Sequence, residues 1–137
     1  MIDAATGWYF VHASVKGVVL AGDEVLLCRN SRDGWELPGG WPSRADGSLA
    51  DVVHREVREE TGLEVEVGPV VGAELLEVPG GGPVVVVALL AHPADKPGLT
   101  PSDEHTEVRF FDCRELPDAL EPGYRELIET ARARNAA

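Results

Sequence analysis

Alternating and continuous apolar stretches predict short strands in the first third of the chain. Ser14–Ala21 is enriched in β-branched residues, as is typical of a strand. Gly22 and Asp23 provide a hairpin turn, and Glu24–Arg29 is the expected partner strand. Two further short extended segments are predicted at Trp8–Val11 and Trp35–Leu37.

The pattern then changes to one that predicts a helix. Pro38–Gly47 contains three glycines and two prolines and is read as a structured loop. Ser48 is a typical N-cap, and Asp51, three residues later, completes a shortened capping box. The helix is expected over Leu49–Thr61, with Gly62 as the glycine that ends it.

The second half predicts more strands and a closing helix. Val84–Ala91 is the most continuous apolar run and indicates a strand buried on both faces. Ala94–His105 is a polar loop, and Tyr124–Arg134 is an amphipathic helix. The other predicted strands are Val65–Val71, Ala73–Val78 and Val108–Phe111. Six or seven strands with two helices predict an α+β fold, a mixed β-sheet sandwiched between helices.

Length and composition place the chain in a broad class. Its 137 residues fit a single domain, 1–137. No apolar run approaches the ~20 residues of a membrane span, so no membrane partner is expected. The first residues, Met1–Ala5, lack the features of a secretory signal. Cys28 and Cys113 are read as buried thiols in a reducing compartment, so a cytoplasmic location is expected.

The formal net charge of −12 constrains the partners. An acidic surface repels phosphate polymers, so we expect no nucleic acid polymer. If the partner is a small phosphate compound, its site must be positive within a negative protein. A bound divalent cation is the simplest way to reverse the local sign.

Three glutamates of the predicted helix conflict with its amphipathic pattern. At 100° per residue, Glu56, Glu59 and Glu60 project within or beside the apolar side. Their i, i+3, i+4 spacing directs them to one patch, where Mg²⁺ would convert their repulsion into ligation. A helix end paired with Arg55 and Arg58 is the alternative, and spacing alone leaves both open. The apolar stripe is formed by Leu49, Val52, Val53 and Val57.

Several motifs together resemble a known family. Gly39-Gly40 followed by Arg55–Leu63 resembles the Nudix box, G-x5-E-x7-R-E-U-x-E-E-x-G-U with U apolar, and its right half matches at every specified position. Trp35–Gly40 is similar to the segment that precedes the box. Glu104–Phe111 is similar to the family's acidic loop before an aromatic strand. The resemblance covers nearly the whole chain.

The left half of the box departs from the pattern. Fourteen residues separate Gly40 from Arg55, one more than the motif has, and the lone glutamate is missing. Counting back from Arg55 gives Gly47 at the position of this glutamate, and counting forward from Gly40 gives Asp46. We expect an insertion in the loop, with Asp46 or Asp51 taking over part of the role at the start of the helix.

The resemblance implies an α/β/α sandwich that hydrolyses a nucleoside diphosphate linked to another moiety X. It implies Mg²⁺ or Mn²⁺ as the cofactor, and Arg55 as the residue that orients a neighbouring glutamate. Glu60 and Arg55 are thus expected catalytic residues. The implied metal ligands are Glu56, Glu59, Glu60 and the main-chain carbonyl of Gly39.

A downstream acid completes the implied chemistry. Glu104 or Glu107 would be the general base or a further ligand. Glu104 is favoured as the base because it follows a more flexible stretch, and Glu107 would be a ligand or a partner of Arg109.

Two residues outside the box are candidates for substrate binding. Arg29 ends a strand that points toward the loop Pro38–Gly47, here called the glycine loop, and could hold a phosphate, although a surface arginine is the alternative. Trp41 could stack on a base, an interaction worth ~1–3 kcal/mol, or simply pack over its loop. The aromatic N-terminal segment leaves a homodimer open.

The expected function is a metal-dependent pyrophosphohydrolase acting on a small nucleotide-like substrate, with X unspecified because specificity resides outside the box. One alternative is a Nudix-like sensor module that binds a nucleotide without cleaving it. A second is an acidic protein-interaction domain whose charges form structural ion pairs.

Overall fold

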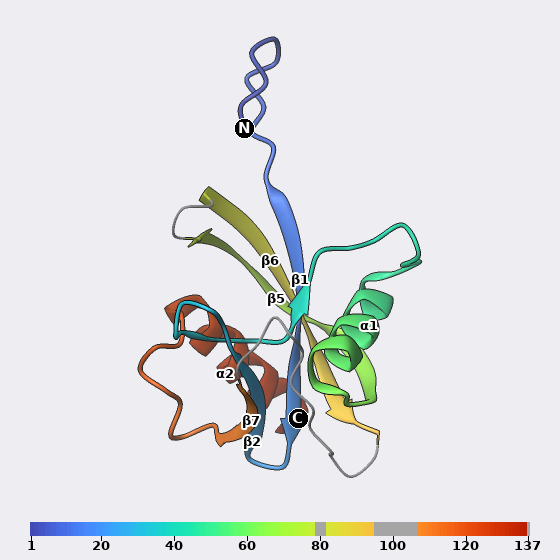
Figure 1. Ribbon diagram of the computed structural model, residues 1–137, viewed down its shortest axis with the longest axis vertical. Helices are drawn as coiled ribbons and strands as arrows, with labels where there is room; N and C mark the ends of the chain where they lie inside the picture. Colours follow the sequence, from blue (N-terminus) through green and yellow to red (C-terminus); the bar gives the residue numbers. More distant parts are fainter. Residues whose placement is uncertain (79–81, 95–106, 137) are drawn as a thin grey trace.

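The computed structural model describes residues 1–78, 82–94 and 107–136, and these fold around a mixed β-sheet (Figure 1). Neither helix within these residues is long and apolar enough to cross a membrane. The elements, in chain order, are β1 (His12–Ala21), β2 (Glu24–Arg29), β3 (Trp35–Glu36), β4 (Gly39–Gly40), α1 (Leu49–Thr61), β5 (Val65–Val78), β6 (Gly82–Pro93), β7 (Glu107–Asp112) and α2 (Pro122–Ala136).

The sheet has the strand order β3-β2-β1-β6-β5, with β4 paired to β1 and β7 paired to β2. β1 and β6 run parallel, from His12 opposite Val84 to Val19 opposite Ala91. The other pairs are antiparallel. The predicted mixed sheet is therefore confirmed, and the long strand β1 lies at its centre.

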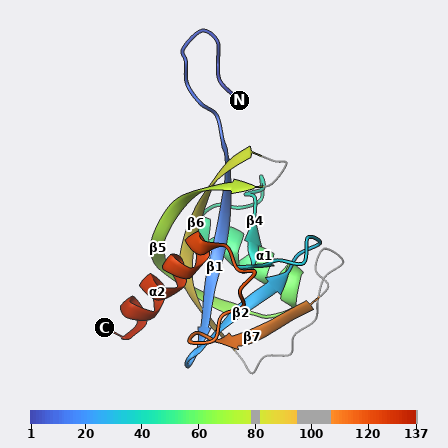
Figure 2. The same cartoon turned by 90° about the vertical axis from the view of Figure 1, so that its left-hand side faces the viewer.

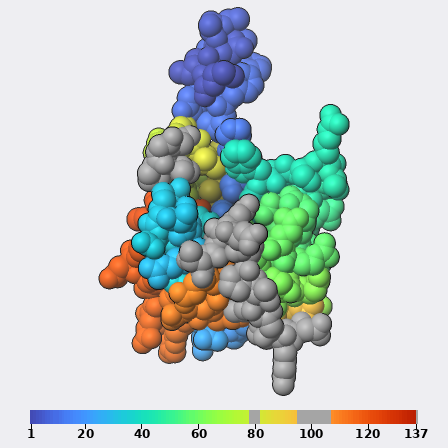
Figure 3. All heavy atoms as spheres, viewed as in Figure 1, coloured from blue at the N-terminus to red at the C-terminus, as the bar shows by residue number. Residues whose placement is uncertain are grey.

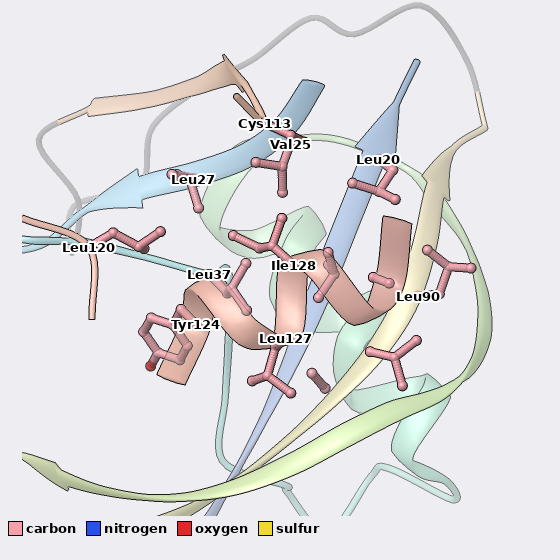
Figure 4. Close-up of a cluster of buried hydrophobic side chains, with 14 of the residues drawn as sticks. Leu20, Val25, Leu27, Leu37, Leu90, Cys113, Leu120, Tyr124, Leu127 and Ile128 are labelled. Atoms are coloured by element: carbon pink, nitrogen blue, oxygen red, sulfur yellow. The ribbon is translucent and has the colours of Figure 1, made fainter. Parts of the chain in front are cut away.

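Each face of the sheet is covered by one helix, as the two perpendicular views show (Figures 1 and 2). Side chains alternate between the faces of a strand, so Val18 and Leu20 of β1 pack with α2 whereas Val15 and Val19 pack with α1. Figure 4 shows Leu127 and Ile128 of α2, labelled among core leucines from the strands and the loop after β3. The predicted sandwich of a sheet between helices is confirmed.

Helix α1 begins and ends where its capping residues predict. The hydroxyl of Ser48 accepts a hydrogen bond from the backbone N–H of Asp51 at 3.1 Å, which satisfies one of the free donors of the first turn. Gly62 adopts the left-handed conformation with φ of 76°, and its N–H bonds the carbonyl of Arg58. Both helix boundaries were thus encoded locally.

Two predicted boundaries are wrong. The strands expected at Val65–Val71 and Ala73–Val78 form one continuous strand, β5, with register shifts between Val67 and Gly72. Gly72 does not end a strand. A Cβ there would lie only 2.9 Å from Leu127, so the glycine allows α2 to pack closely against β5. The predicted loop Pro38–Gly47 also contains the short strand β4.

The predicted strand Trp8–Val11 is likewise wrong. β1 begins at His12, and residues 1–11 form a separate N-terminal arm that projects from the body (Figures 1 and 2). Within the arm, Ile2 and Tyr9 form an isolated antiparallel bridge. The aromatic residues that indicated a strand do not join the sheet.

Candidate active site

The glycine pair of β4 brings the loop against the sheet and the first helix. Gly39 lies opposite Lys16 of β1, and the carbonyl of Pro38 accepts a hydrogen bond from the N–H of Gly17 at 2.9 Å. Gly39 has a φ of +148°, and a Cβ there would overlap the carbonyl oxygen of Val15. Only glycine fits this position, so the backbone can approach the helix closely.

Glu60 is the most deeply buried of the three helix glutamates, with 4% of its surface exposed. Its Oε2 accepts a hydrogen bond from the backbone N–H of Gly39 at 2.8 Å. A buried carboxylate needs such a donor, because an unsatisfied charge in the interior is strongly unfavourable. The bond fixes the end of α1 to the glycine loop.

Arg55 connects the other two glutamates. Its Nη1 donates to Oε1 of Glu56 at 2.9 Å and to Oε2 of Glu59 at 3.3 Å. Its Nη2 donates to the main-chain carbonyl of Trp41 at 3.1 Å. Arg55 therefore contacts two of the predicted ligands and also joins α1 to the glycine loop.

The lengthened loop supplies a further acid to Arg55. Asp46 accepts two hydrogen bonds from the guanidinium, one from Nε at 3.1 Å and one from Nη2 at 2.8 Å. These bonds lower the pKa of Asp46 to about 2 and raise that of Arg55. Asp51 instead accepts from the N–H of Gly47 at 2.9 Å. The sequence did not decide between Asp46 and Asp51 as the acid at the start of the helix. In the structure Asp46 pairs with Arg55, whereas Asp51 binds the backbone just before the helix.

Gly40 provides the space that Glu56 occupies. A Cβ at this position would lie 2.7 Å from the carboxyl carbon and from Oε1 of Glu56. The side chain of Glu56 is largely shielded, with 15% of it exposed. The second glycine of the pair thus sets the position of a carboxylate, whereas the first sets the path of the backbone.

The predicted common patch of three carboxylates is only partly formed. Glu56 and Glu59 meet at one nitrogen of Arg55, but Glu60 lies beneath them on Gly39. Within the described ranges, no three His, Cys, Asp or Glu side chains gather closely enough to hold a metal ion. Leu49, predicted in the apolar stripe, is exposed. The available donors are all carboxylate oxygens, the type that Mg²⁺ and Mn²⁺ prefer, so the donor set fits a hard divalent cation.

A pocket of about 710 Å³ opens on the other side of the glycine loop. Its wall includes alternate residues of β1, which share one face of the strand. Glu36 and Trp41 line the pocket, whereas Gly39 and Gly40, which lie between them in the chain, contact Glu60 and Glu56. The β1 residues in the wall are His12, Ser14 and Lys16.

Lys16 is a pocket residue that the sequence analysis missed. It is almost fully buried, at 6% exposure. Burial lowers its pKa, but the negative charges of Glu36 and Glu60, together with Tyr124, outweigh this effect, so the pKa is raised above its ordinary value. Lys16 thus contributes a buried positive charge in an acidic protein. The position of Lys16 within a predicted core strand could have indicated a buried charge from the sequence.

The two predicted substrate-binding residues have different positions. Trp41 lines the pocket, and its ring stacks on that of His12 with centroids 4.4 Å apart and planes 11° from parallel. Arg29 is not among the lining residues. It forms ion pairs with Asp33 at 3.6 Å and with Glu107 at 3.9 Å. Arg29 is thus a partly exposed arginine at the end of β2, and its role in phosphate binding stays a prediction.

Of the two candidate general bases, Glu104 and Glu107, the structure describes only the second. Glu104 lies outside the described residues. Glu107, at the start of β7, forms ion pairs with Arg29 at 3.9 Å and with Arg109 at 3.8 Å. The expected pairing of Glu107 with Arg109 is therefore present.

Comparison with known proteins places this chain in a family. The family model described as NUDIX domain matches residues 11–131. The curated isopentenyl-diphosphate Delta-isomerase of Cereibacter sphaeroides is 28% identical over 125 residues, which cover 80% of this chain and 68% of that protein.

Solved structures agree with the family match. The ADP-ribose pyrophosphatase of Streptococcus suis 89-1591 is 28% identical, with a TM-score of 0.75 and coverage of 93% of this chain and 94% of that one. The MutT protein of Methanosarcina mazei Go1 is 25% identical, with a TM-score of 0.77 and coverage of 93% and 96%.

The chain belongs to the Nudix family. It is a Nudix hydrolase, of the pyrophosphohydrolase type. Such hydrolases generally use divalent metal ions and act on small nucleotide-like substrates.

Proposed function

We propose that the protein is a Mg²⁺-dependent pyrophosphohydrolase that cleaves a nucleoside diphosphate linked to another moiety X, with Mn²⁺ as a substitute cofactor. The observation that supports this proposal most directly is the arrangement around Arg55. This one side chain contacts Glu56, Glu59 and the loop carbonyl of Trp41, next to the buried Glu60. The proposed active site lies within a single domain, 1–137.

The helix carboxylates are proposed to hold the metal. Glu56, Glu59 and Glu60 would be its side-chain ligands, with the carbonyl of Gly39 as a main-chain ligand. When bound, the metal neutralises the diphosphate and lowers the pKa of the attacking water. Arg55 holds Glu56 and Glu59 toward each other, and the N–H of Gly39 holds Glu60 in one orientation. This preorganisation is the main contribution that phosphoryl transfer requires of a protein.

The pocket is proposed to hold the nucleoside or X part of the substrate. Trp41 offers an exposed aromatic surface at its rim, already aligned by His12, and Arg29 is left as a more distant phosphate-binding candidate. Lys16 supplies a buried positive charge between the pocket and Glu60. A substrate that spans the glycine loop would place its diphosphate near the glutamates and its other end in the pocket.

Glu104 remains the proposed general base. The carboxylate of Glu107 already pairs with two arginines, Arg29 at 3.9 Å and Arg109 at 3.8 Å, which hold it at the start of β7. The test is the pH–rate profile of the Glu104→Ala and Glu107→Ala variants. Loss of the acidic limb in Glu104→Ala alone is expected, whereas its loss only in Glu107→Ala would reverse the assignment.

Hydrolysis is distinguished from the alternatives by a substrate panel assayed with Mg²⁺ and Mn²⁺. The panel contains nucleoside triphosphates, ADP-ribose, sugar nucleotides, dinucleoside polyphosphates and isopentenyl diphosphate. A sensor module would bind one of these without cleaving it, and isomerisation of isopentenyl diphosphate would indicate the chemistry named for the curated relative. Release of two phosphate-containing products from a nucleotide is the expected result.

The proposal places the enzyme in the cytoplasm, without a nucleic acid polymer or a membrane as partner. The acidic net charge supports the absence of a nucleic acid partner. The two buried free thiols, Cys28 and Cys113, support a reducing compartment. We also propose that two copies form a homodimer.

A further inference from the structure

The N-terminal arm, residues 1–11, is a small folded unit that stands apart from the domain. The N–H of Phe10 bonds the carbonyl of Met1 at 2.7 Å, and the N–H of Asp3 bonds the carbonyl of Trp8 at 2.8 Å. These bonds fold the arm back on itself. Figure 3 shows it as a knob beyond the main body. A two-stranded hairpin alone is at best marginally stable in water, so the arm is expected to gain stability from a further contact.

The arm exposes an unusual share of large apolar side chains. Trp8 is 67% exposed, and half of the surface of Phe10 is exposed. Single exposed apolar residues are ordinary, but a contiguous set marks an interaction surface. The exposed large apolar residues of the arm are Met1, Ile2, Trp8, Tyr9 and Phe10.

The charges of the arm are few, and each is held by hydrogen bonds within the arm. Asp3 is its only charged side chain. The carboxylate of Asp3 accepts hydrogen bonds from the N–H groups of Ala5 and Thr6, both at 2.9 Å, and the amino terminus donates to the carbonyl of Phe10 at 3.0 Å. The arm therefore presents an almost uncharged surface on a chain of net charge −12. Two such chains repel each other over most of their surfaces, and the arm is where they can meet at low electrostatic cost.

The area available matches what a dimer needs. If all of their exposed area is buried, five large side chains with these exposures supply about 600 Å² per copy, or about 1,200 Å² across a symmetric pair, which is the lower end of specific interfaces. In a two-fold dimer the same patch of both copies is in contact, so the apolar arm of one copy would pack against the apolar arm of the other. A partner with a basic surface would instead bind the acidic body.

We propose that the N-terminal arm is the self-association surface of this protein and that its partner is the arm of a second copy. This deepens the homodimer included in the proposed function and is independent of the hydrolytic activity. The arm runs directly into His12, whose ring stacks on Trp41 at the pocket rim.

The test measures the molar mass of the full chain in solution by light scattering and sedimentation at micromolar concentration. The variant is the double substitution Trp8→Ser and Phe10→Ser. The matched control is Leu75→Ser, which removes an equally exposed apolar side chain, 65% exposed, from β5. The arm lies outside both core clusters, so the double variant is expected to fold, as circular dichroism and thermal melting will check.

The wild type and the Leu75→Ser control are expected to have twice the 14.7 kDa mass of one chain, and the double variant the mass of a single chain. A monomeric wild type would overturn the proposal, whether the arm is free or binds a different partner. A double variant that remains dimeric would overturn it as well, because another surface would then form the dimer. Since mass is the readout, these results hold whatever substrate the enzyme cleaves.

Discussion

Gly40→Ala changes the position of one proposed metal ligand while leaving the backbone free to fold. The added Cβ would lie 2.7 Å from the carboxylate of Glu56, against at least 3.4 Å in ordinary contact. Glu56 must therefore move by several tenths of an ångström or rotate away, and it then loses its 2.9 Å bond to Arg55. Gly40 is not in the left-handed region, so alanine is compatible with its backbone conformation.

Displacement of a catalytic group by about 1 Å can cost about a hundredfold in rate, which equals about 2.7 kcal/mol of transition-state stabilisation. We expect kcat/KM of Gly40→Ala to fall by about this factor, with the melting temperature within a few degrees of the wild type. Gly39→Ala is the contrasting variant, because its Cβ meets the fixed backbone of Val15 and should impair folding. Wild-type kcat/KM in a folded Gly40→Ala protein would refute the assigned position of Glu56.

Three further predictions concern the same site. Glu60→Gln keeps the side-chain size and an acceptor for the N–H of Gly39, yet should lower kcat by more than about a hundredfold in a folded protein; near-native turnover would falsify its role as a ligand. Mg²⁺ without substrate should raise the melting temperature of the wild type more than that of Glu60→Gln, since the unfolded chain cannot gather the ligands; an equal rise would show that the ion acts elsewhere. The lowered pKa of Asp46 stabilises the fold above pH 3.8, and this contribution is lost as pH falls toward about 2. Asp46→Asn should therefore reduce the pH dependence of the free energy of unfolding in that window, measured by urea denaturation; an unchanged dependence would contradict the pairing of Asp46 with Arg55.

The sequence was sufficient for features encoded by local chemistry. Ser48 and Gly62 fixed the ends of α1, because capping depends on residues a few positions apart. The amphipathic helix predicted over Tyr124–Arg134 is also present, and Leu127 and Ile128 form part of its buried side. The parallel pairing of β1 with β6 was not predictable from these patterns, because it depends on contacts between distant segments.

The missed features arise from tertiary context. Three glutamates at i, i+3 and i+4 lie on one side of a helix, but the sequence did not show that the backbone of Gly39 would bind Glu60 beneath the other two. The pairing of Asp46 with Arg55 depends on the path of the lengthened loop. Lys16 faces the pocket because β1 is central and its residues alternate between two faces.

The most direct test of the account is metal-dependent hydrolysis of a nucleoside diphosphate–X compound by the wild type and by Glu60→Gln, followed by separation of the products. The account predicts that the wild type with Mg²⁺ yields two phosphate-containing products, that chelation of the metal stops the reaction, and that Glu60→Gln binds the compound but does not cleave it. Binding without cleavage by the wild type, across all substrate classes and with both Mg²⁺ and Mn²⁺, would contradict it.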